Sequence, residues 1–134
     1  MIELVWDAGR AATARTSSGV ALSIGNHGLA AADLVGAAAA SCLMQAFLEA
    51  ADEAGVPVLG YMATADVESR SGSDGPIVRL HSYVVVPDDI TEREVARLAD
   101  AARRASPVAR LLGDRCVARW DLRVVHGAGT DVAP

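Results

Sequence analysis

The sequence contains no lysine, so all 12 of its positive charges are arginines, and 17 acidic residues outnumber them. Aromatic residues make up only 4% of the chain. Nucleic-acid binding rests on a basic surface and on aromatic side chains that stack against bases. A chain with a formal net charge of -5 and few aromatic residues lacks both, so we expect no nucleic-acid partner.

Several other signals are missing. The first residues, MIELVWD, lack the basic segment of a secretory signal, and no apolar stretch of membrane-spanning length is free of charge. No pair of histidines or cysteines has metal-ligand spacing, and no glycine-rich phosphate loop is present. The sequence therefore predicts a cytoplasmic protein without membrane, metal or cofactor. Its two cysteines should be reduced there unless they take part in redox chemistry.

The length of 134 residues suits a single domain over residues 1–134, and no internal repeat, linker or low-complexity segment divides it. Hydrophobic residues make up 51% of the chain, which is high for a soluble protein. This excess suggests that part of the apolar surface is buried between subunits.

The most informative segment runs from Ala30 to Gly55 and is crowded with alanine and leucine, the best helix formers. Asp33 suits the positive end of a helix dipole, and Gly55 followed two residues later by Pro57 is a strong stop. The predicted helix is roughly 35 Å long. It is apolar on most sides, which predicts burial on most sides, and Cys42 lies in its middle.

Alternating apolar and polar residues predict strands on both sides of this helix. The predicted strands are 2–7, 12–16, 20–24, 61–68, 78–86 and 116–124. Residues 71–76 read as a hairpin loop. Thr91 and Glu94 form a capping box that begins a second helix, which runs into Ser106 and Pro107. The order β-β-β-α-β-β-α-β predicts the α+β class with a largely antiparallel sheet.

These segments together resemble the OsmC/Ohr family of thiol peroxidases over nearly the whole chain. The resemblance rests on the helical sequence DLVGAAAASC, the Gly55-Val56-Pro57 after it, the strand that ends in VVVP, and Ser106-Pro107-Val108 before the last strand. It implies an OsmC-like fold and an intertwined dimer, in which sheets from both subunits wrap the central helices. It also implies that a reactive cysteine reduces organic hydroperoxides.

The chain departs from the family pattern at two positions. The family has a second cysteine in a CPV motif, and Ser106 stands at that position here. The family also carries a glutamate ten residues before the helix cysteine, where this chain has Ala32. The neighbouring Asp33 does not replace it directly, because it points about 100° away around the helix.

The resemblance implies that Cys42, Arg10 and Ser106 form the catalytic site, with the arginine holding the thiolate. Arg15 is nearly as good a match as Arg10. From the residues alone, Cys42 is more readily a buried structural cysteine than a nucleophile, since free cysteine is among the most buried residues. Cys116 is favoured as a core residue over a resolving thiol, because it lies on the apolar face of a predicted strand.

The sequence is compatible with two functions. In the first, Cys42 reduces an organic hydroperoxide in an apolar pocket at the dimer interface, and an external thiol reduces the resulting sulfenic acid. In the second, the protein has kept the fold, has lost the peroxidase activity, and binds or transforms a small hydrophobic molecule in the same pocket. The presence of Cys42 favours the first, and the two departures favour the second.

Overall fold

The structure is a computed structural model that describes residues 1–25, 28–68, 77–115 and 119–127. The chain divides into two compact units, Met1–Val35 and Gly36–Pro134. The hairpin loop predicted at residues 71–76 lies outside the described residues, as does Cys116. Each predicted helix and strand has a counterpart in the structure, so the α+β class is confirmed.

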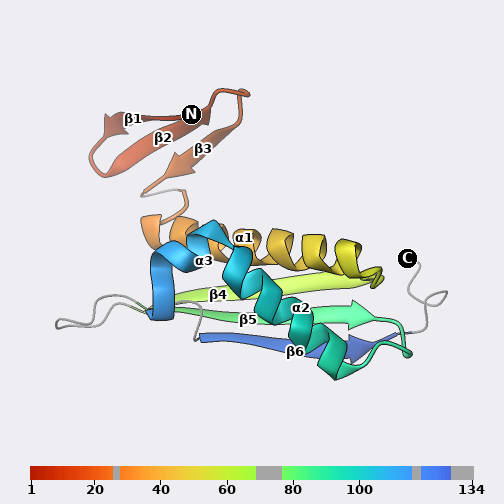
Figure 1. Cartoon of the computed structure of the whole chain (residues 1–134). Coiled ribbons are helices and arrows are strands. Elements are labelled where there is room, and N and C mark those ends of the chain that lie inside the picture. The colour runs from red at the N-terminus through yellow and green to blue at the C-terminus, as the bar shows by residue number, and fades with distance from the viewer. Residues whose placement is uncertain (26–27, 69–76, 116–118, 128–134) are drawn as a thin grey trace. The chain divides into compact units, whose positions relative to one another are not determined.

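The first unit contains a three-stranded antiparallel sheet in the order β1-β2-β3 (Figure 1). Its strands are β1 (Ile2–Ala8), β2 (Ala11–Thr16) and β3 (Ala21–Ile24). The register places Leu4 opposite Ala14 and Ala14 opposite Leu22, so apolar side chains collect on one face. Leu4 is 65% exposed and Trp6 on the same face is 73% exposed. This sheet therefore has an apolar face that its own unit leaves largely uncovered.

The second unit is built on another three-stranded sheet, in the order β4-β5-β6. Its strands are β4 (Gly60–Glu68), β5 (Ile77–Val86) and β6 (Trp120–His126). β4 and β5 are antiparallel, whereas β6 runs parallel to β5. The prediction of a largely antiparallel arrangement holds for the other pairs. The parallel pair arises because two helices connect β5 to β6, and a connection of that length can return the chain to the same end of the sheet.

The central helix, α1 (Ala31–Ala54), matches its predicted bounds closely. At its start, Asp33 Oδ2 accepts a hydrogen bond from Ala30 N at 3.1 Å, which caps the first turn. One stripe of the helix is buried, and its members recur every three or four residues: Gly36, Ala39, Leu43, Phe47 and Ala51. Among the described residues, α1 is therefore not buried on most sides, as the composition predicted it would be.

By length and composition alone, α1 could also cross a membrane. The core helix of a soluble protein meets the same criterion, so one such helix is weak evidence for a membrane location. The buried stripe of α1 packs into the core of the second unit together with the inner face of β5. This packing explains the apolar stripe without a bilayer.

Helix α2 (Glu92–Ala105) begins where the sequence predicts. The side chain of Thr91 accepts a hydrogen bond from Glu94 N, and the Glu94 carboxylate accepts one from Thr91 N at 2.7 Å. The Glu94 carboxylate accepts hydrogen bonds from Thr91 N and from the Thr91 hydroxyl, and these two bonds lower the pKa of Glu94 below its usual value. α2 lies with α1 on one side of the second sheet (Figure 1), and its buried residues join the same core.

The chain after α2 differs from the prediction. The helix ends at Ala105, and a separate helix, α3 (Pro107–Leu112), follows before a short 3-10 helix, η1 (Gly113–Arg115). Ser106 is the C-cap of α2 and the N-cap of α3 at once. Proline at the first position of α3 needs no backbone donor, so the Ser-Pro pair starts a new helix instead of only ending the old one.

The core of the second unit contains a small polar cluster. Ser82 is 2% exposed, and its hydroxyl accepts a hydrogen bond from Trp120 Nε1 at 2.9 Å. Burial raises the pKa of Tyr61, and the nearby Ser82 hydroxyl offsets part of that rise. Within the described residues, however, no hydrogen bond of acceptable geometry reaches the buried Tyr61 hydroxyl. The Tyr61 ring packs against Phe47, with ring centroids 5.9 Å apart.

Candidate active site

Cys42 lies near the middle of α1 and is partly buried, with a free thiol. A mid-helix sulfur receives little help from the helix dipole, whose effect is confined to the terminal turns. Its environment must therefore come from the elements that pack against α1. The residue that supplies it is Ser106, which is 64 positions away in the sequence.

Ser106 is fully buried between α2 and α3. Its hydroxyl donates a hydrogen bond to Cys42 Sγ at 3.0 Å and accepts one from Ala109 N at 3.3 Å. A serine hydroxyl has one hydrogen to donate. Because Ala109 N–H is itself a donor, that hydrogen remains available for the sulfur. The backbone N of Ser106 also donates to Ala102 O at 2.9 Å. Contacts with α2 and with α3 therefore fix the position of the Ser106 hydroxyl.

The Cys42–Ser106 pair can stabilise a thiolate but cannot form a disulfide. The thiolate is the reactive form of cysteine, and a hydroxyl that donates to the sulfur stabilises negative charge on it. The same pair cannot close a disulfide, because the position facing Cys42 holds an oxygen. The site can thus support nucleophilic attack by sulfur but leaves the later reduction of that sulfur to another thiol.

The predicted arginine partner is not placed by this geometry. Arg10 lies in the turn after β1 and Arg15 in β2, and both are exposed. They belong to the first unit, whereas Cys42 and Ser106 belong to the second. The pairing of either arginine with the sulfur therefore stays a prediction. The expected core role of Cys116 also stays a prediction, because Cys116 lies outside the described residues.

The sequence also contains a helix-start signal at Ser106, although the predicted order of elements includes no helix there. Serine followed by proline is a typical start of a helix, and it would have placed Ser106 at the N-terminus of α3. The partners of its hydroxyl could not be read in this way, because they depend on how α2 and α3 pack against α1. Among the residues that the structure describes, no three histidine, cysteine or acidic side chains gather into a metal site.

Comparisons with known proteins identify the family of the chain and its fold. The profile of the OsmC-like protein family matches residues 24–120. An OsmC-like protein from Mycoplasma pneumoniae superposes with a TM-score of 0.79 at 13% identity, over 94% of this chain and 95% of that one. An organic hydroperoxide resistance protein OsmC from Legionella pneumophila gives 0.65 at 14% identity, over 96% of both chains.

The organic hydroperoxide resistance protein OhrB of Bacillus subtilis is similar as well, with a TM-score of 0.64 at 16% identity, over 95% of this chain and 98% of that one. No curated protein sequence matches the chain significantly. These identities are low, so the solved structures establish the shared fold, and the profile match, which spans most of the chain, establishes the family. The OsmC-like fold predicted from the sequence is thereby confirmed, and the chain belongs to the family of OsmC-like proteins.

Proposed function

We propose that this protein is a thiol-dependent reductase of organic hydroperoxides that acts through Cys42 alone. The observation that carries the proposal is the hydrogen bond from the buried Ser106 hydroxyl to Cys42 Sγ. It connects the helix cysteine to the position where the family resemblance implies a second one. Arg10, or Arg15 in its place, would supply the positive charge that holds the thiolate.

In the proposed reaction, the hydroperoxide oxidises Cys42, and two external thiols then reduce it. The Cys42 thiolate attacks the distal oxygen of the hydroperoxide, the S–O bond forms, the O–O bond breaks, and the alkoxide leaves as an alcohol after taking up a proton. A first external thiol then attacks the sulfenic acid, which gives a mixed disulfide and water. A second thiol releases Cys42 and carries away the disulfide. Two thiols are thus oxidised for each hydroperoxide reduced.

Two observations support an organic hydroperoxide as the substrate and an external thiol as the reductant. The similar structures from Legionella pneumophila and Bacillus subtilis are named as organic hydroperoxide resistance proteins, which favours organic hydroperoxides as the substrate class. The hydroxyl of Ser106 cannot attack a sulfenic acid to close a disulfide, so the reductant must come from outside the pair. We expect the working protein to be a homodimer, as the apolar excess of the sequence suggests, and we also expect it to be cytoplasmic.

Hydroperoxide consumption in the presence of a dithiol tests the proposal. Cys42→Ser should abolish turnover, whereas Cys116→Ser should leave it intact. Ser106→Ala removes a hydrogen bond to a charged sulfur, so it should slow the oxidation step about tenfold or more. Full turnover by Cys42→Ser would contradict the proposal.

A second candidate function is binding or transformation of a small hydrophobic molecule without redox chemistry. It is favoured by the hydroxyl that faces Cys42 and by the absence of a carboxylate at Ala32. This candidate predicts that the protein binds apolar ligands equally well with and without the Cys42 thiol. It also predicts no difference in hydroperoxide consumption between the wild-type protein and Cys42→Ser.

A further inference from the structure

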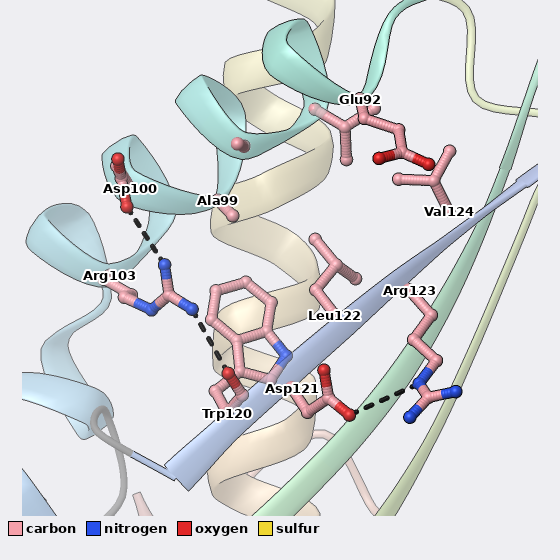
Figure 2. A pocket seen from close by; sticks show the side chains of 11 residues that line it. Glu92, Ala99, Asp100, Arg103, Trp120, Asp121, Leu122, Arg123 and Val124 are labelled. Atoms are coloured by element: carbon pink, nitrogen blue, oxygen red, sulfur yellow. Dashed lines mark hydrogen bonds and ion pairs between the residues drawn. The ribbon is translucent and has the colours of Figure 1, made fainter.

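A groove of about 560 Å³ lies between α2 and β6, in the second unit. Figure 2 shows that the side chains of Leu122 and Val124 point from β6 into the groove, with Trp120 at one end. From the α2 side it is lined by Val95, Ala96 and Ala99. The volume lies within the range of ligand pockets, and much of the lining is apolar.

The strand that borders this groove is an edge strand. Of the strands that the structure describes, β5 alone pairs with β6. In a parallel pair, alternate residues turn both backbone groups toward the partner strand. Gly127 N donates to Val86 O at 2.9 Å, so the odd-numbered residues of β6 face β5. Leu122 and Val124 therefore direct their N–H and C=O groups toward the free edge, beside the groove that their side chains line.

The end of the groove at Trp120 is closed by polar contacts. Arg103 lies over the Trp120 ring, with its guanidinium carbon 4.9 Å from the ring centroid. It donates to Trp120 O at 3.2 Å and to Asp100 Oδ1 at 3.0 Å. Among the described residues, the edge is thus occupied at Trp120, and no hydrogen bond engages the edge-facing backbone groups of Leu122 and Val124.

The groove also has an excess of negative charge. Its lining includes three carboxylates and two guanidiniums. Both guanidiniums are engaged, Arg103 with Asp100 and Arg123 with Asp121 at 3.4 Å. The Glu92 carboxylate reaches toward Val124 in Figure 2, and among the described residues it has no hydrogen bond or ion pair. A cationic group at this end of the groove would find an unpaired carboxylate.

We propose that the groove binds an extended peptide, which adds to β6 as a further strand. The peptide backbone pairs with Leu122 and Val124, and every second side chain enters the groove between β6 and α2. The lining of the groove selects apolar side chains at most of the groove-facing positions of the peptide, and a lysine or arginine at the groove-facing position opposite Glu92. This site is separate from Cys42, and the proposal does not depend on the proposed function.

Binding of fluorescent, acetylated hexapeptides to the full chain tests the proposal by anisotropy. The first peptide, called the valine–lysine peptide, has valine at two of its alternate, groove-facing positions, lysine at the third and threonine in between. The second peptide has glutamate in place of that lysine, and the third is the valine–lysine peptide with N-methyl groups on the backbone nitrogens that would pair with β6. Saturable binding of the first peptide, with much weaker binding of the other two, is the expected result. Equal binding of the N-methylated peptide would show an apolar cation site without strand pairing and overturn the proposal, as would no saturable binding up to millimolar concentration.

Matched variants locate the binding at the groove. Ala96→Trp fills the groove from an exposed position of α2, so affinity should fall at least tenfold, while Arg97→Trp on the next residue should leave it unchanged. Glu92→Gln should weaken the valine–lysine peptide about two- to fivefold, as expected for an exposed ion pair. Asp89→Asn makes the same change in charge outside the groove and should have no effect. Loss of affinity in the control variants, or none in Ala96→Trp, would overturn the proposal.

Discussion

A single buried hydroxyl decides what the candidate site can do. Ser106 has no exposed surface, and its side chain is held between the Ala109 N–H and the Cys42 sulfur. An oxygen at this position can stabilise a thiolate but cannot form a bond to it. A sulfur at the same position could do both, so the exchange of one atom decides whether residue 106 can close a disulfide with Cys42.

The first prediction at this scale concerns Ser106→Cys, made together with Cys116→Ser. The distance of 3.0 Å between Ser106 Oγ and Cys42 Sγ indicates that two sulfurs could meet here with little movement of the chain. A disulfide requires Cα atoms within about 7 Å of each other. After one equivalent of an organic hydroperoxide, this variant should form an intramolecular disulfide, detected as the loss of two titratable thiols. If both thiols stay reduced, although both titrate in the unfolded chain, the redox account of Cys42 is wrong.

The buried hydroxyl of Tyr61 gives a second residue-scale prediction. Burial raises the pKa of Tyr61 above 10.0, so the folded state keeps a proton that the unfolded chain releases more readily. The resulting stability is fully present below pH 10 and is lost as the pH rises above it. The free energy of unfolding of Tyr61→Phe should therefore fall less between pH 9 and 11 than that of the wild type.

Tyr61→Phe also removes a buried hydroxyl that lacks a well-formed hydrogen bond within the described residues. At neutral pH the variant should be as stable as the wild type or more stable by about 1 kcal/mol. A loss of more than that amount would show that the Tyr61 hydroxyl has a hydrogen-bond partner in solution. Denaturant titrations at several pH values measure both effects.

Among the elements, α2 has the most completely specified start. Thr91 and Glu94 satisfy one another's backbone donors, and this reciprocal pair is visible in the sequence because it depends only on residues three apart. Thr91→Ala should lower the free energy of unfolding by about 1 kcal/mol, since it removes the cap oxygen. Thr91→Asn keeps an acceptor at that position and should remain close to the wild type. Equal destabilisation by both changes would mean that the hydroxyl does not act as a cap.

Local patterns explain how much of the fold could be predicted. The bounds of α1, the start of α2 and the inward residues of β5 follow from periodicity and capping, which involve near neighbours. The contact of Ser106 with Cys42 and the stacking of Arg103 on Trp120 join residues from different elements. Such contacts depend on helix packing, which the sequence pattern of one element does not encode. The resemblance to a family pointed to Ser106 as a site residue, and the geometry then gave its partners.

At the scale of the whole molecule, the exposed apolar surface is the dominant feature. The first unit leaves the face of its sheet that carries Leu4 and Trp6 largely uncovered, and the described residues of the second unit bury α1 along one stripe. Large exposed apolar surfaces mark interfaces between chains. This exposure supports the dimer expected from the composition and the family resemblance.

The dimer prediction can be tested with two substitutions in β1. Leu4→Asp places a charge on the apolar face, so it should dissociate the dimer or prevent folding at micromolar concentration. Val5→Asp places the same charge on the opposite face of the same strand and should leave the dimer intact. Light scattering measures the mass of each protein. A folded wild-type monomer at micromolar concentration would contradict the prediction.

If Cys42 is the nucleophile of a one-cysteine hydroperoxide reductase, an organic hydroperoxide should convert its thiol to a sulfenic acid. Intact mass spectrometry after one equivalent of an organic hydroperoxide, with dimedone present to trap sulfenic acid, measures this step. We expect one dimedone adduct per chain in the wild type and in Cys116→Ser, and none in Cys42→Ser. An unmodified wild-type protein, or an adduct that persists in Cys42→Ser, would show that Cys42 is not the nucleophile.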